Sequence, residues 1–498
     1  SQLQDELKLG KFLDTPDKVS GFVRDTNRAS YGQMLLETFR NWLISGPITH
    51  ATYALGNKLY AFYKAVPETT AQAIVGALHE AVAPLKEGEL KRVTAGEVQE
   101  GLYTMLYAQK DGLKATWDSF KAGQTLGLPG EGSIYDLAHR QAMKEKLEGQ
   151  EFTDRVEVLR KRYVTDMAYR QANKEGIPQM TPGGQDNPEY LRRVEDIIND
   201  PKSNDLIVDQ KYTTPFTNTK AIPGALGTLI RIPGERMVAP LHSFDRTVGY
   251  LTNRNKFAFR QAVQEGLQGQ DRAKRIIELQ SDPDIMRRAR NEATEQTLMG
   301  QSKSNFMRAV QGVLSWEADL PLLGETQPLK FISPFATVAA NINRLAIIDR
   351  SPLGYLISKD LRDTINGKNG RFAQDEAIAK MGLGTAFYGT VGGLVLDGTV
   401  QPSADKDRNK ARIDAVTKGL PHSIRVGEMS YALDRLGILG NMFGLAADMF
   451  EVARYAYDTH EYTKAGVAAL HAIYNHVAEE GFMSGISDML KAADEPDR

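Results

Sequence analysis

The chain has 498 residues, no cysteine, and 61 basic against 63 acidic side chains. With 41% apolar and 25% charged residues, its composition is that of a globular protein, which excludes collagen-like and wholly disordered chains. The missing cysteines exclude disulfides, Cys-ligated zinc and thiol catalysis, and the balanced charge gives no overall field that would attract nucleic acid. We therefore expect a soluble, intracellular type of protein with several domains, or one elongated assembly subunit.

Segments rich in glycine and proline divide the chain. They lie at 123–133, 176–188, 213–240 and 398–412. The segment 213–240 carries four prolines and is expected to be an ordered but irregular crossing, and 398–412 is expected to be a polar loop. We predict four domains: an N-terminal helical domain at 1–122, a charged helical region at 134–212, a central helical domain at 213–345, and a Gly/Ala-rich apolar helical domain at 346–498.

Apolar residues three and four positions apart dominate the sequence. From Pro47 onward they share one face of a predicted helix, which Pro67 is expected to end. A second such stripe, from Phe244 to Ala262, follows Pro240. We interpret both stripes as core or helix–helix packing. The pattern predicts a mainly α protein, an elongated multi-helix assembly subunit with one or two short β-hairpins.

One strand signal stands out near residues 422–432. His422–Val426 and Met429–Ala432 are separated by Gly427-Glu428. Glycine at the first turn position is typical of a type II′ hairpin. We therefore predict a short hairpin there.

Apolar, glycine-rich segments distinguish the C-terminal third. Lys380 and Asp397 enclose sixteen uncharged residues, and extending the segment back to Ala377 includes a lysine that could reach a headgroup layer. A helix of sixteen residues spans roughly 24 Å, against a hydrocarbon layer of ~30 Å. Similar stretches follow at 436–447 and 465–478.

Two of these segments contain glycines four residues apart, which allow helices to approach closely. The pairs are Gly389 with Gly393, and Gly440 with Gly444. Two interpretations stay open: tightly packed helices in a soluble bundle, or segments that are soluble in one assembly and meet lipid in another. In the second, Leu394 is a candidate membrane-contact residue.

The search for catalytic, cofactor and metal sites yields no candidate. His471 and His476 are five residues apart, which places them on different sides of a helix, and no G-x-S-x-G elbow or P-loop is present. Nothing in the spacing of the carboxylates nominates a glycosidase pair. We therefore expect no enzyme activity, no cofactor and no metal.

A basic row offers one candidate for contact with nucleic acid. It carries only two acidic residues and is interleaved with aromatic side chains, which can stack on single strands. Its basic members are Arg231, Arg236, Arg246, Arg254, Lys256 and Arg260. The alternative is a solvated face or a contact between subunits.

Three blocks resemble the internal virion, or DNA-ejection, proteins of tailed bacteriophages and the phage polyvalent proteins that share their C-terminal region. The first is RNWLISGPITHATYALGN at 40–57, and the second, at 230–262, looks like the family's arginine–proline helix with a central Asp. The third begins at Leu329 with LKFISPFATVAANINRLAIIDRSPLG, and FMSGISDML at 482–490 is typical of the family's end. The chain departs from the pattern after Pro334-Phe335, where the family usually has Arg-Thr-Pro, and no Glu is followed by Ser as in a transglycosylase.

The resemblance implies a structural protein that is packaged inside a phage particle and released with the genome. It would then oligomerise into a conduit across the host cell envelope. The implied partners are further copies of the chain, other ejection, portal or tail proteins, passing double-stranded DNA, and the host membrane. The alternatives are a segment of a peptidoglycan-degrading virion enzyme and a DNA-binding packaging protein.

Overall fold

The chain is described by a computed structural model, whose described residues are 31–43, 47–84, 92–131, 133–145, 149–181, 184–200, 221–222, 224–297, 318–320, 324–326, 341, 344–403, 413, 417, 419–433 and 437–459. The prediction of a mainly α fold with short β-hairpins is confirmed. The predicted apolar stretch at 465–478, which includes His471 and His476, and the block at 482–490 lie outside these residues.

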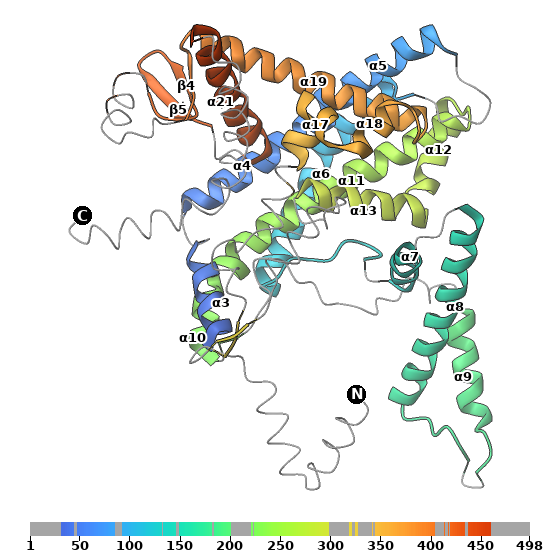
Figure 1. Ribbon diagram of the computed structural model, residues 1–498. Coiled ribbons are helices and arrows are strands. Elements are labelled where there is room, and N and C mark those ends of the chain that lie inside the picture. Colours follow the sequence, from blue (N-terminus) through green and yellow to red (C-terminus); the bar gives the residue numbers. More distant parts are fainter. Residues whose placement is uncertain are drawn as a thin grey trace.

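The long helix α11 (Ala239–Gln264) forms the centre of the fold. Helix α6 (Ala95–Ala122) packs along it, and α12 (Gly269–Leu279) and α13 (Pro283–Gln296) cover another side (Figure 1). The contact between α6 and α11 is close, because Gly112 faces Phe244 and Val248, where a Cβ would come within 2.8 Å of both side chains. The predicted N-terminal and central domains therefore meet along this helix pair.

A second group of helices lies beside the first. Helix α4 (Pro47–Tyr63) continues through the π-helical turn η1 (Lys64–Glu68) into α5 (Thr69–Val82), and α19 (Arg371–Leu396) packs on α5. Helix α21 (Gly437–Thr459) packs on both α19 and α4. The short elements η4 (Arg344–Ile348), α17 (Pro352–Ile357) and α18 (Lys359–Ile365) complete this group.

The remaining helices form two smaller units. Helix α7 (Ile134–Lys144) packs on α8 (Gly149–Lys174), which pairs with α9 (Pro188–Asn199) at the lower right of Figure 1. Helix α3 (Tyr31–Leu43) contacts α10 (Gly224–Ile232). Among the described residues, the buried apolar side chains fall into separate clusters, and the largest joins α4, η4, α19 and α21.

Two predictions about proline are wrong. Pro67 does not end the first helix but lies inside η1, and residues 224–240 are helical through α10, the π-helical turn η3 (Pro233–Val238) and the first turn of α11. Proline lacks an N–H and its ring clashes with the preceding turn of an α-helix. A wider π turn accommodates both effects, so these helices continue where the sequence rule ends them.

The predicted hairpin is present, with one more strand than expected. Strands β4 (Ser423–Val426) and β5 (Met429–Ala432) pair antiparallel across Gly427, whose φ of +64° suits the first position of a type II′ turn. Strand β3 (Val400–Gln401), in the segment expected to be a loop, adds to β4. A second hairpin joins β1 (Ala318–Leu320) to β2 (Gly324–Thr326).

The two described apolar C-terminal segments pack against each other, and one face of the first is exposed. Residues 377–396 belong to α19 and residues 437–447 to α21, and the two helices contact each other. Within the part of the chain that the structure describes, no helix combines the length and the apolar character needed to cross a membrane.

Candidate functional site

A network of buried ion pairs lies where the two main helix groups meet. At its centre, Arg350 donates to Glu68 at 2.6 Å, and these side chains are 0% and 1% exposed. Arg350 also donates to the Tyr60 hydroxyl at 3.0 Å and to the carbonyl of Leu345 at 3.0 Å. One guanidinium thereby ties η1 and α4 to η4.

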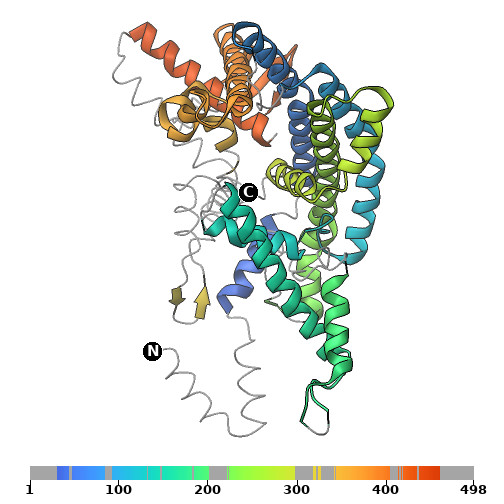
Figure 2. The ribbon, with the colours of Figure 1, turned by 90° about the vertical axis from the view of Figure 1, so that its right-hand side faces the viewer.

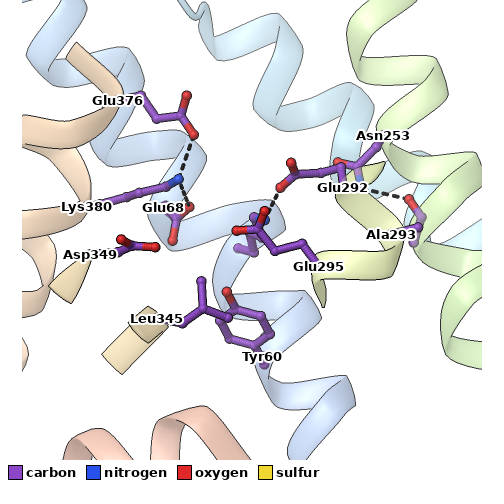
Figure 3. Close-up of polar contacts among 12 residues, drawn as sticks. Tyr60, Glu68, Asn253, Glu292, Ala293, Glu295, Leu345, Asp349, Glu376 and Lys380 are labelled. Carbon is purple, nitrogen blue, oxygen red and sulfur yellow. Dashed lines mark hydrogen bonds and ion pairs between the residues drawn. The ribbon is translucent and has the colours of Figure 1, made fainter. Parts of the chain in front are cut away.

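Lys380 extends the network to α19. Its ammonium lies 2.7 Å from Glu376 and 3.9 Å from Glu68, so it stands between the two carboxylates (Figure 3). The Coulomb attraction of Lys380 lowers the pKa of Glu376 to about 2. Burial lowers the pKa of Lys380 itself, but Glu376 and Glu68 outweigh burial and hold it well above its usual value. The one lysine in the apolar segment 377–396 is therefore an internal ion-pair partner.

Helix α13 closes the other side of the network. Glu292 pairs with Lys64 of η1, and Glu295 accepts from Arg344 of η4 at 2.9 Å. Burial would raise the pKa of Glu68, but the positive charges of Arg350, Lys380 and Lys64 lower it below its usual value. Glu68 is therefore ionised at neutral pH.

Four of the network's charged residues lie on π-helical turns or close to them. Lys64 and Glu68 begin and end η1, Arg344 begins η4, and Arg350 follows η4 by two residues. A π turn shifts the residues that follow it around the helix axis, which sets the direction of the charged side chains. The geometry of the network therefore depends on the π turns at the helix junction.

Spacing rules did not find this network, because its partners are far apart in sequence. Glu68 and Arg350 are separated by 282 residues, and Lys64 and Glu292 by 228. A signal was present: Tyr60, Lys64 and Glu68 recur every four residues on the apolar helix 47–66 and its continuation. Charged residues on the buried face of a helix require partners.

A small cavity adjoins the network between α4, α6, α11 and α13. Its volume is about 10 Å³, which is the room that a single water molecule needs. Lys64, Lys256, Thr252 and Asn253 are among its lining residues. Lys256 donates to the Thr69 hydroxyl at 2.9 Å, and burial lowers its pKa. The cavity is too small for an organic substrate.

The basic row does not form the expected nucleic-acid face. Arg231, Arg246 and Lys256 are buried, and every member of the row contacts another part of the chain. The partners of Arg231, Arg236, Arg246, Arg254, Lys256 and Arg260 are respectively Glu37, the carbonyl of Lys121, Glu131, Gln280, Thr69 and Glu97. These groups hold helices together, so the alternative of a fully solvated face does not apply either.

The glycine pair of α19 does not lie at the contact with α21. Gly389 and Gly393 are exposed, and a Cβ at either position would meet no atom within 4 Å. The close approach to α21 falls at Gly392, where a Cβ would overlap the Phe450 ring. Within the described residues, the pair Gly389 and Gly393 therefore does not provide the close helix approach, which lies one residue before Gly393.

The other predicted packing residues lie inside. Leu394 is half-buried against the largest apolar cluster, and Gly440 and Gly444 are buried in α21. Leu394 therefore packs against the core from its edge, and its contact with lipid stays a prediction.

The ion pairs of the network can hold the helices in register, because each charged group pairs with another group of the network. Within the described ranges, no three His, Asp or Glu side chains lie close enough to share a metal ion. We therefore describe the site as a structural junction. Comparison of the chain with models of protein families, with curated proteins and with solved structures finds no match.

Proposed function

We propose that the chain is a structural internal virion protein of a tailed bacteriophage, released with the genome to form part of a conduit across the host envelope. The proposal starts from the three sequence blocks that resemble this family. It places the protein inside the capsid and afterwards in the host envelope or periplasm. Its partners there would be further copies of itself and other ejection, portal or tail proteins, with double-stranded DNA passing through.

The order of the three blocks carries the proposal, because several short resemblances in the family's order are hard to obtain by accident. Parts of the blocks also lie near one another in the fold. Asn57, which ends the first block, donates to Asp245, the aspartate of the second, at 2.9 Å. Arg350 of the third block donates to Tyr60, three residues beyond the first.

The physical character of the junction suits a protein that crosses a narrow tail unfolded and refolds. Buried ion pairs such as Glu68–Arg350 add little net stability, because desolvation offsets their attraction. As a hypothesis for this chain, they instead specify which helices meet. The separate apolar clusters likewise avoid a single large core. We infer that such a fold unfolds readily and refolds to one defined structure.

Quantitative mass spectrometry of the phage that encodes this sequence tests the proposal. Full particles should contain peptides of the chain, and particles emptied by triggered genome release should have lost them, while capsid peptides stay constant. If the peptides are absent from full particles, or remain in emptied ones, the proposal is wrong.

A further inference from the structure

The small cavity between α4, α6, α11 and α13 adjoins a buried hydroxyl group that lacks a partner. Thr252 of α11 lines the cavity and is 5% exposed, and its Oγ1 forms no hydrogen bond with any described residue. Helices α4, α6 and α13 pack around α11, so this hydroxyl lies inside the protein (Figure 2). Buried polar groups almost always have a hydrogen-bond partner, because an unpaired one is costly. The cavity is therefore the place where a partner of this hydroxyl would lie.

Other helical threonines of the chain pair their hydroxyls within their own helices. Those of Thr116, Thr294 and Thr385 donate to the carbonyl four residues earlier, at 2.9, 2.8 and 2.7 Å. This bond is open to a threonine inside an α-helix. Thr252 does not form it with the carbonyl of Val248, although both residues lie within α11. Its hydroxyl is therefore available to a group outside its own helix.

Two further polar side chains line the same cavity. Lys256 lies one turn beyond Thr252, and its ammonium donates to the Thr69 hydroxyl at 2.9 Å. Two of its three N–H groups find no acceptor in the described part of the chain. From α13, the side-chain oxygen of Gln296 lies over Gly249, where a Cβ would come within 2.5 Å of it. Hydrogen-bond donors and an acceptor from two helices therefore meet at the cavity.

Volume and charge together favour a water molecule as the occupant. The cavity measures about 10 Å³, which is the room that one water molecule needs. A chloride ion is larger, and Glu292, which pairs with Lys64 of the cavity lining, would repel it. Lys64 and Lys256 would repel a metal cation. A small neutral molecule that both donates and accepts hydrogen bonds suits this lining best.

We propose that the cavity binds a single water molecule, which accepts a hydrogen bond from the Lys256 ammonium and shares one with the Thr252 hydroxyl. Its remaining proton is donated to the side-chain oxygen of Gln296. Because Thr69 accepts from Lys256 and donates to the carbonyl of Lys64 at 2.9 Å, the water extends a hydrogen-bonded chain that begins in η1. It thereby links η1, α5, α11 and α13, and it belongs to the fold whatever the function of the protein.

A crystal structure of the 498-residue chain and urea unfolding of two variants test the inference. Thr252→Val removes the hydroxyl but keeps the shape of the side chain and nearly its helix propensity. Thr390→Val is the matched control, because Thr390 is exposed on α19 and donates to the carbonyl of Ala386 at 2.9 Å. Unfolding is measured in sodium chloride and, at equal ionic strength, in sodium gluconate, whose anion is too large for the cavity.

We expect electron density for one water molecule within hydrogen-bond distance of Thr252 Oγ1. Thr252→Val should raise the equilibrium constant of unfolding roughly two- to tenfold, because the bound water loses a partner. Thr390→Val should leave this constant nearly unchanged. The change of salt should shift the urea midpoints of the wild type and of Thr252→Val alike, since no anion is bound.

Three results would overturn the inference. An unchanged or higher urea midpoint for Thr252→Val would mean that its hydroxyl has no partner to lose. A cavity without density, in a crystal structure that shows other buried waters, would exclude bound water even if Thr252→Val does not fold. A stabilisation by chloride that Thr252→Val abolishes would identify an anion as the occupant. Since none of these measurements involves phage particles, their failure and that of the proposed function are distinguishable.

Discussion

Replacing Glu68 with glutamine should strongly destabilise the protein. The substitution keeps the shape of the side chain but leaves the Arg350 guanidinium, which is 0% exposed, without its carboxylate. The new amide oxygen, the Tyr60 hydroxyl and the Leu345 carbonyl could still accept from it, but none of them carries a negative charge. Removing one partner of a buried ion pair costs about 3–5 kcal/mol, because the remaining charge stays desolvated.

Urea unfolding followed by circular dichroism measures the effect, with Glu265→Gln as the matched control. Glu265 also pairs with an arginine, Arg275, at 2.8 Å, but their side chains are 33% and 37% exposed. Water replaces a lost partner there, so the midpoint should hardly change. The double variant Glu68→Gln with Arg350→Met should recover much of the loss, since the buried guanidinium that lost its carboxylate is gone as well. If Glu68→Gln shifts the midpoint no more than Glu265→Gln, the buried network does not hold the junction.

Three further predictions concern other parts of the molecule. Burial raises the pKa of Asp245 to about 7 from its usual 3.8, so the stability that its protonated form contributes is lost as the pH rises to 7 and above. At pH 8 the free energy of unfolding of Asp245→Asn should therefore exceed that of the wild type by about 1–3 kcal/mol, seen as a higher melting temperature. At pH 4 the two proteins should melt alike. Gly392→Ala should lower the free energy of unfolding by about 1–3 kcal/mol through overpacking against α21, whereas Gly393→Ala should raise it by about 0.5–1 kcal/mol in urea titrations. Arg236→Gln with Arg254→Gln should not change the mobility of DNA relative to the wild type at either of two salt concentrations, because both arginines contact the chain itself. If the wild type shifts DNA in a salt-dependent way and the variant does not, the DNA-binding alternative is restored.

The helices and the hairpin could be predicted because their signals are local. Apolar spacing identified α4 and α11, and Gly427 identified the turn between β4 and β5. The ends of the helices were less predictable. Pro67 lies within a continuing helix because its surroundings support a π turn there, which no local rule indicates.

The buried junction could not be predicted because it depends on contacts between distant segments. Lys380 resembled the charged end of an apolar segment until Glu68, far away in sequence, was found beside it. Similarly, Arg246 resembled a phosphate-binding residue, but Glu131 accepts from it inside the protein. A charge pattern in sequence does not distinguish a surface that binds phosphate from a helix face that binds carboxylates.

Following the protein into the host tests whether it is ejected into the cell envelope. Host cells would be infected synchronously and fractionated within minutes, and peptides of the chain would be quantified in the envelope, the cytosol and the empty particles. If the chain forms part of an envelope conduit, its peptides leave the particle and accumulate in the envelope fraction. Peptides that stay with the empty particle, or enter the cytosol with the genome, would refute the conduit.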